Sequence, residues 1–276
     1  MNYVYLTNGG SGGSDYSSMV ELEGGQLRMT NCIIDGSAKN GIHAYQGKFT
    51  QFENNQIKNC NAYPIYAWDG YSPFEKMNTT TTFSGNTKNY AHIGGSSVSE
   101  DVTTLPKINI PWYFANGLYI HPSNTMTLTI EAGTKLYFNS DKAMDIGAKV
   151  KLIAEGTASD IIVIRGMEDE AGFWRGLILR STRDGNKLNY CDISGSGSQD
   201  QNDWGGNSNL YLYGNKDNLQ IHNTKISKSK HYGIGFDSRD SHTIDHQNVT
   251  FESCAKGNIW DWETRNTWSS LGDVPW

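Results

Sequence analysis

Apolar and polar residues alternate along many short segments of this chain. Leu128 and Ile130 alternate with threonines, and Leu136 and Phe138 resume the alternation after an Ala-Gly corner. Such a period of two puts the apolar side chains on one face of a β-strand and the polar ones on the other. Asn, Gly and Ser separate the segments, and these residues favour turns. The pattern therefore predicts an all-β protein built from short strands.

Two long segments of the chain repeat each other. The stretch Leu219–Ile234 (LQIHNTKISKSKHYGI) matches Leu27–Ile42 (LRMTNCIIDGSAKNGI) at six positions. The offset between the two copies increases along the chain, from the pair Tyr3/Tyr190 to the pair Trp68/Trp262, because the loops of the second copy are longer. Insertions confined to loops are typical of repeat architectures, in which each unit stacks on its neighbours.

A shorter period lies inside the long repeat and defines one coil. Ile65 repeats the position of Ile42 in the first copy, and Ile259 repeats that of Ile234 in the second. One coil cannot bury its own apolar side chains, but stacked coils can. The regularly spaced leucines of leucine-rich repeats are absent, and an immunoglobulin-type sandwich would not repeat at this period. We therefore predict an all-β, single-stranded right-handed parallel β-helix (β-solenoid) with about 22–25 residues per coil.

The repeat also predicts how the chain is divided. Residues 1–97 match the later part of a repeat unit, so we expect the chain to begin inside a partial first unit. Residues 98–276 form the second unit, and the pattern leaves open whether the two make one continuous solenoid or two abutting ones.

No signal-peptide pattern follows Met1. We expect the chain to be a processed or trimmed part of a larger parent protein.

Several motifs of the second unit carry a resemblance to a known family. The segments TLTIEAGTKLYF, KLIAEGTASDIIVIRG, FWRGLIL and KLNYCDISGSG, in that order, resemble the right-handed parallel β-helix repeat proteins that bacteria secrete or anchor at their surface. The likeness covers roughly residues 100–262, and residues 1–95 match the later part of the same unit. It implies an extracellular or outer-surface location. That family is mostly uncharacterised, so the resemblance implies a fold and no particular activity.

Charge and composition argue against several classes of partner and cofactor. Charged residues make up 19 % of the chain, the net charge is −6, and no basic run indicates nucleic acid. No apolar segment is long enough to cross a bilayer, so no transmembrane segment is predicted.

The four cysteines form no CxxC pair, which leaves a zinc site without support and favours small buried thiols. We predict no cofactor. The cysteines are Cys32, Cys60, Cys191 and Cys254.

Strand parity assigns a set of aromatic side chains to the outside of the solenoid. If Ile42 and Ala44 point inward, His43 and Tyr45 point outward, and the same parity applies to the equivalent strands. Exposed aromatic rings on a sheet suit the faces of sugar rings and mark an interaction surface. We therefore expect non-catalytic binding of a polysaccharide or another surface macromolecule. The predicted binding residues are Tyr45, Tyr66, Trp68, Tyr211, Tyr213, Trp260 and Trp262.

Two structural interpretations compete with this binding face. Loops could fold over the rings and bury them, because Tyr and Trp also stabilise strands by cross-strand stacking. Trp260 and Trp262 could instead cap the end of the solenoid. Asp261 falls on the inward parity, which a solenoid interior would resist, and this favours the cap for that pair. A third function class, a structural or adhesin stalk, would need no binding face at all.

A catalytic role has weaker candidates. The second copy differs from the first at His231, Asp237 and Asp240, which could serve a polysaccharide lyase or a glycoside hydrolase acting on a complex glycan. A glycosidase needs two carboxylates as acid and base, and Asp237 with Asp240 is the available pair. The loop that carries Asp200 and Asp203 is acidic, but calcium binds six or more oxygens, so no metal site is predicted.

Overall fold

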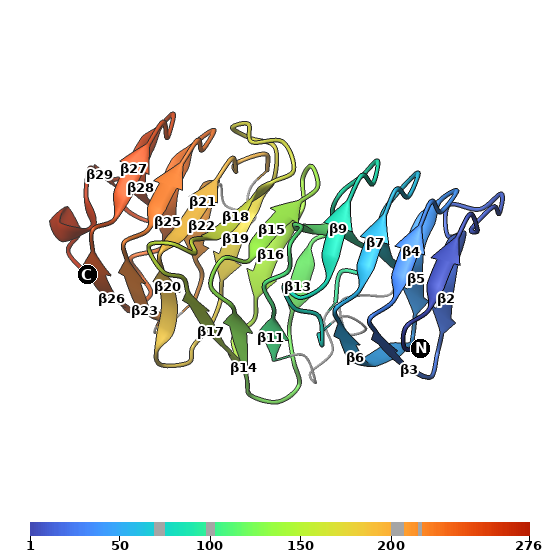
Figure 1. Ribbon diagram of the computed structural model, residues 1–276. Helices are drawn as coiled ribbons and strands as arrows, with labels where there is room; N and C mark the ends of the chain where they lie inside the picture. Colours follow the sequence, from blue (N-terminus) through green and yellow to red (C-terminus); the bar gives the residue numbers. More distant parts are fainter. Residues whose placement is uncertain (69–74, 98–102, 200–206, 215–216) are drawn as a thin grey trace. The chain divides into compact units, whose positions relative to one another are not determined.

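The computed structural model describes residues 1–68, 75–97, 103–199, 207–214 and 217–276. Short parallel strands stack coil upon coil in this part of the chain, so the protein is a β-solenoid, as predicted (Figure 1). The chain divides into two compact units, Met1–Asn116 and Gly117–Trp276. We call them the N-terminal and the C-terminal unit. The predicted division at 97/98 stays a prediction from the repeat, and residues 98–102 lie outside the described part.

The N-terminal unit contains three sets of parallel strands. The first consists of β1 (Tyr5–Thr7), β4 (Ile33–Asp35), β7 (Gln56–Lys58) and β9 (Thr82–Ser84). The second consists of β2 (Ser18–Glu23), β5 (Asn40–Tyr45), β8 (Ile65–Ala67), β10 (Ala91–Ile93) and β12 (Trp112–Phe114). The third is the pair β3 (Gln26–Thr30) and β6 (Lys48–Glu53), and β11 (Thr104–Leu105) also lies in this unit. The β2–β12 set carries the site described below.

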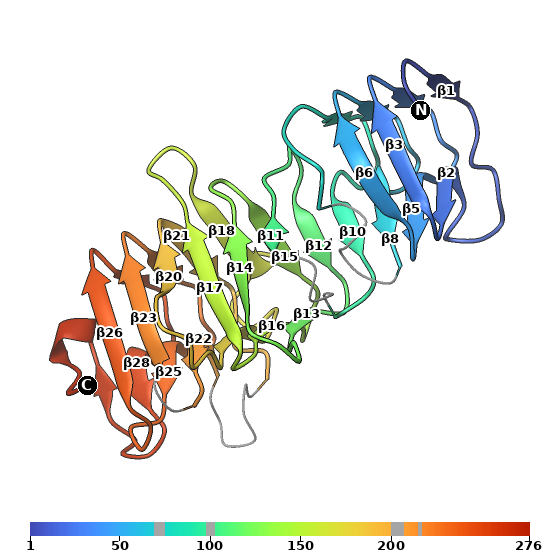
Figure 2. The same cartoon turned by 90° about the horizontal axis from the view of Figure 1, so that it is seen from below.

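The C-terminal unit has three sets of strands as well (Figure 2). One set is β13 (Leu118–Ile120), β16 (Ala143–Ile146), β19 (Gly176–Leu179), β22 (Ser208–Leu212), β25 (Tyr232–Phe236) and β28 (Gly257–Asp261). A second is β14 (Met126–Ile130), β17 (Val150–Glu155), β20 (Asn186–Asn189), β23 (Asp217–His222) and β26 (His242–Gln247). The third is β15 (Lys135–Phe138), β18 (Ile162–Gly166), β21 (Cys191–Ser194), β24 (Lys225–Ser227) and β27 (Thr250–Glu252). The chain then forms β29 (Thr267–Trp268) and the 3₁₀ turn η2 (Leu271–Asp273).

The strand register confirms the coil spacing inferred from the repeat. Ile42 pairs with Ile65, and Ile234 pairs with Ile259, so the residues that the repeat placed one coil apart are direct neighbours. Coils in the middle of the C-terminal unit are longer, since Met144 of β16 pairs with Leu177 of β19. The additional residues lie in loops, where insertions leave the stacked strands unchanged.

The core consists of the inward residues of stacked strands. Leu128, Ile130, Leu136 and Phe138, all predicted to point inward, are buried. A fully buried side chain of this size contributes roughly 1.5–3 kcal/mol to the free energy of folding. Because a solenoid coil has no core of its own, this contribution exists only when the neighbouring coil is present.

Asparagines hold the corners between strands. Asn31 and Asn223 have φ values of 53° and 49°, a left-handed conformation that Asn tolerates better than most residues. The Asn31 side chain donates to Asn2 of the preceding coil at 3.0 Å. Asn248, one coil after Asn223, donates to the Asn223 side chain, also at 3.0 Å. Asparagine at these two equivalent corners therefore adopts the left-handed turn and takes part in a hydrogen bond to a neighbouring coil.

The four cysteines are free thiols. Cys32, Cys60 and Cys191 are buried and Cys254 is half-buried. Burial raises the pKa of the Cys60 thiol to about 11, so this thiol keeps its proton at neutral pH. No helix within the described ranges is long and apolar enough to span a membrane.

Candidate functional site

An outward row of side chains crosses the β2–β12 set in the N-terminal unit. The register places Glu21 beside His43, His43 beside Tyr66, Tyr66 beside His92, and His92 beside Tyr113. The rings of Tyr66 and His92 are stacked with their centroids 4.4 Å apart. Strand parity had assigned His43 and Tyr66 to the outside. It made no assignment for His92 and Tyr113, because they lie in coils whose spacing departs from the repeat.

Tyr16, which precedes β2, lies across this row. Its ring centroid is 5.6 Å from that of His43, 5.9 Å from that of Tyr66 and 4.9 Å from that of Trp68. This cover is one reason why Tyr66, although outward by register, is 8 % exposed. Burial raises the pKa of the Tyr66 hydroxyl to about 12, so it remains a protonated hydrogen-bond donor.

Beside Tyr16 the surface forms an open pocket of about 280 Å³. Its walls include two exposed rings, Tyr45 at 37 % and Trp68 at 46 % exposure. We call this the aromatic pocket. It is lined by Tyr16, Glu23, His43, Tyr45 and Trp68.

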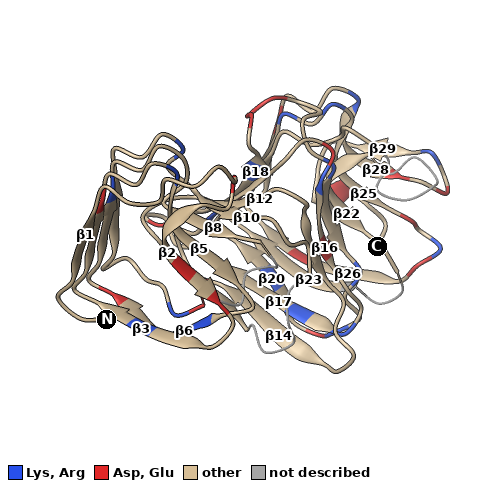
Figure 3. Ribbon diagram, turned by 90° about the vertical axis from the view of Figure 1, so that its right-hand side faces the viewer, with Lys and Arg blue, Asp and Glu red and all other residues tan. Residues whose placement is uncertain are grey.

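One lining residue of the aromatic pocket, His43, contacts a carboxylate on the neighbouring strand. The Nδ1 atom of His43 lies 3.4 Å from a carboxylate oxygen of Glu21. The other ring nitrogen, Nε2, is buried and has no hydrogen-bond partner in the described part of the chain. Glu21 and Glu23 are the acidic positions on β2 that Figure 3 marks in red. The pocket therefore combines apolar ring faces with a few polar groups, as small-molecule sites usually do.

The outward aromatics of the C-terminal unit are mostly covered. Tyr211 is 1 % and Trp260 6 % exposed, whereas Tyr213 is 40 % exposed. The Arg180 guanidinium lies 4.1 Å above the Tyr213 ring and pairs with the buried Asp145. Trp262 is half-buried, with two guanidinium groups, those of Arg239 and Arg265, at 4.7 Å and 4.9 Å from its ring centroid.

Trp260 belongs to the end of the solenoid. Its ring stacks on Tyr232 with centroids 5.0 Å apart, and its strand pairs antiparallel with β29. Asp261 is buried and accepts hydrogen bonds from Ser238 and Thr264. Although burial raises the pKa of Asp261, the hydrogen bonds from Thr264 and Ser238 lower it overall. The antiparallel strand and the bonded aspartate form the cap that the inward parity of Asp261 had indicated.

The candidate catalytic residues do not meet at one point. Asp237 and Asp240 line a pocket of about 270 Å³ together with Tyr211, Tyr213 and Arg239. His231 precedes β25 and Asp237 follows it, which separates their backbones by roughly 20 Å along an extended strand.

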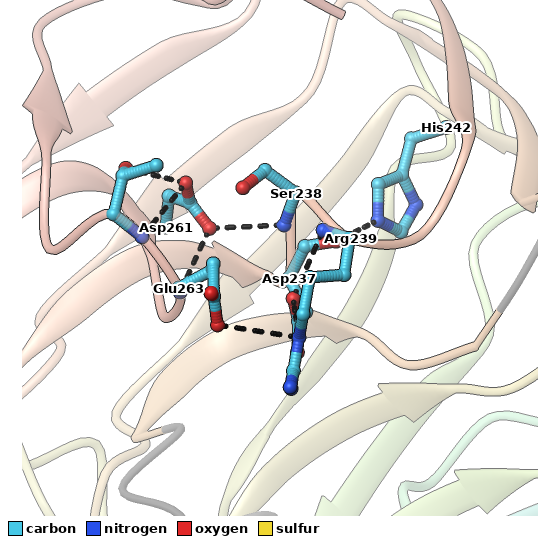
Figure 4. Close-up of polar contacts among 7 residues, drawn as sticks. Asp237, Ser238, Arg239, His242, Asp261 and Glu263 are labelled. Carbon is cyan, nitrogen blue, oxygen red and sulfur yellow. Dashed lines mark hydrogen bonds and ion pairs between the residues drawn. The ribbon is translucent and has the colours of Figure 1, made fainter.

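Asp237 is held by an ion pair (Figure 4). The Arg239 side chain donates to both carboxylate oxygens of Asp237 and also lies 3.3 Å from Glu263. The hydrogen bonds from Arg239 lower the pKa of Asp237, which keeps it ionised at neutral pH. A general acid needs the opposite shift, so this aspartate is poorly suited to that role.

Metal binding gains no support from the structure. Asp200 and Asp203 lie outside the described residues, and the residues that the structure describes hold no group of three or more His, Cys, Asp or Glu side chains that could bind a metal ion.

Three residues of the aromatic pocket, Tyr16, Glu23 and His43, are not among the binding residues predicted from the sequence. Glu23 and His43 lie on the outward parity but are not Tyr or Trp, and Tyr16 lies in a loop without periodicity. No family model, curated protein or solved structure matches this chain. The pocket must therefore be interpreted from its own chemistry.

Proposed function

We propose that the N-terminal unit binds a glycan, without turning it over, in the aromatic pocket. The observation that carries this proposal is the pair of exposed rings, Trp68 and Tyr45, on the walls of a concave site. Sugar rings present C–H groups that pack on such aromatic faces, while Glu23 offers an acceptor to sugar hydroxyls.

Binding is favoured over hydrolysis because the pocket lacks the usual arrangement of acid groups. A glycosidase places two carboxyl groups on either side of the bond that it cleaves. Here Glu21 contacts His43, and Glu23, two positions further along the same strand, is the carboxylate that lines the pocket. We further propose an extracellular or outer-surface location in a bacterium, which rests on the family resemblance of the repeat motifs.

The binding test compares matched aromatic substitutions. Trp68→Ala and Tyr45→Ala are each expected to weaken binding to the best oligosaccharide of a glycan panel by roughly 10-fold or more, measured by isothermal titration calorimetry. Tyr213→Ala removes a similarly exposed ring from the C-terminal unit and serves as the control, with unchanged affinity. Circular dichroism verifies that each variant folds. If no glycan of the panel binds the native protein, the proposal is wrong.

One observation favours an enzyme as the second candidate. The Glu21–His43 contact orients an imidazole whose Nε2 has no described partner, and this is how a general base is commonly held. The same panel, incubated for long periods and analysed by mass spectrometry, would then yield products that His43→Ala abolishes. Intact glycans after incubation would leave binding as the function.

A further inference from the structure

A second pocket in the N-terminal unit is lined by Tyr66. Its volume is about 340 Å³. Lys39 precedes β5, Lys88 precedes β10, and His92 belongs to β10. We call it the basic pocket. It is lined by Asp15, Lys39, Asn40, Asn61, Ala62, Tyr63, Tyr66, Lys88 and His92.

The basic pocket has an excess of positive charge. Lys88 donates to the Tyr63 hydroxyl at 3.2 Å and lies 4.7 Å from the centre of that ring. Among the described residues it has no carboxylate partner. Lys39 lies 3.7 Å from Asp15, but the Asp15 side chain is 93 % exposed, so water screens that pair. Two lysines against one exposed aspartate leave a net charge of about +1 for a ligand to neutralise.

A buried imidazole without a partner also lines the basic pocket. His92 is 9 % exposed, and its Nδ1 atom has no hydrogen-bond partner in the described part of the chain. Burial lowers the pKa of His92 to about 4, so the ring is neutral at pH 7. A neutral imidazole protonated on Nδ1 can donate one hydrogen bond to an acceptor on a ligand. An unpaired buried polar atom costs free energy, which a bound acceptor would recover.

The two pockets adjoin each other but differ in charge. Tyr16 lines the aromatic pocket, and its ring packs against Tyr66, which lines the basic pocket. The aromatic pocket contains the carboxylate of Glu23, which disfavours an anion there. A ligand that fills both pockets must therefore carry an uncharged ring at one end and an acceptor with negative charge at the other.

We propose that the ligand is an acidic oligosaccharide containing a uronic acid. A neutral sugar packs on Trp68 and Tyr45, and the carboxylate of a neighbouring sugar lies between Lys88, Lys39 and His92. This inference rests on the proposed glycan binding and names its substrate class. The site offers two separate ammonium groups and no arginine fork, and its small net charge matches a singly charged group.

The test compares acidic oligosaccharides with their carboxyl-reduced counterparts, which keep the sugar and lose the charge. The probes are oligogalacturonates, oligoalginates and hyaluronan oligosaccharides, with sulfated galactan oligosaccharides as a separate arm. We expect at least one carboxylated probe to bind about 10-fold or more tightly than its reduced form at low salt, with the preference shrinking in about 0.5 M NaCl. Lys88→Gln is expected to remove the preference while binding of the reduced form remains.

Lys58→Gln is the matched control, because Lys58 lies in the same unit, pairs with Asp35 at 3.4 Å and lines neither pocket. It should leave the preference intact. Equal affinity for acidic and reduced forms overturns this inference and leaves glycan binding standing. Preference for the sulfated arm alone overturns the assignment to a carboxylate. Failure of every probe, charged or neutral, overturns the inference together with the proposed function.

Discussion

At the scale of single residues, His92 shows how burial alters the protonation of a side chain. It lies on the outward parity of β10, yet Tyr66, Tyr63 and Tyr113 surround its ring. Because burial disfavours the charged imidazolium, the folded protein holds the pKa of His92 near 4, against about 6.5 in the unfolded chain. The unfolded state therefore binds a proton that the folded state does not.

This difference predicts a loss of stability as the pH falls from about 6.5 towards 4. Between pH 7.5 and pH 5 the free energy of unfolding should drop by about 2 kcal/mol on account of this single group. His92→Phe keeps the aromatic ring and removes the titration, so its stability should be less dependent on pH over the same interval. Urea unfolding at the two pH values measures both slopes. Identical slopes for the two proteins would contradict the prediction.

At the scale of elements, buried asparagines join one coil to the next. The Asn55 side chain accepts from the backbone N–H of Cys32 at 3.0 Å and donates to the carbonyl of Met29 at 3.1 Å. Asn86 makes the equivalent pair of bonds to Cys60 and Ile57 one coil further on. These amides satisfy backbone groups at corners where the strand ladder is interrupted.

Asn55→Ala should therefore be strongly destabilising. It leaves one buried N–H and one buried carbonyl without partners, which costs about 2–4 kcal/mol in the free energy of unfolding. Gln56→Ala, an exposed position next to it at the start of β7, is the control and should change stability by less than about 1 kcal/mol. Chemical denaturation of both variants measures the difference. A loss for Asn55→Ala no larger than that of the control would show that water replaces the amide.

At the scale of the whole molecule, a solenoid must protect the strand edges where its stacking stops. In the C-terminal unit β29 pairs antiparallel with β28, and Leu271 and Val274 of the following segment are buried. The Trp276 ring packs on Phe236 with centroids 4.9 Å apart. An uncovered parallel strand would offer its backbone to another chain.

Removing residues 267–276 should expose β28 and cause self-association. Light scattering after size-exclusion chromatography is expected to show oligomers that grow with concentration, whereas the full chain keeps a constant mass. Adding Trp260→Lys to the shortened chain places a charge on the edge strand and should reduce the association. A shortened chain that stays as monodisperse as the full one would show that the cap is dispensable.

The candidate site was predictable only in part, and particular residues show why. Tyr45, Tyr66 and Trp68 follow from strand parity, because a period of two fixes the face on which a side chain lies. Their exposure does not follow, since Tyr16 reaches Tyr66 and Trp68 from a loop, and yet Tyr66 is buried while Trp68 stays exposed. The same parity grouped Tyr211 and Trp260 with the exposed rings, but both are buried, and Trp260 lies on the strand that pairs with β29.

The sequence by itself determined the local and repeating features of this protein: the short strands, the coil period, the inward Leu and Ile, and the corner asparagines. These depend on residues close in sequence or on equivalent positions of stacked coils, so periodicity carries them. The tertiary structure alone decided which outward rings stay open, that Lys39, Lys88 and His92 line one pocket, and that β25 separates His231 from Asp237. Loop conformation and the unequal length of the coils decide how close these residues come to one another. Neither leaves a periodic pattern in the sequence.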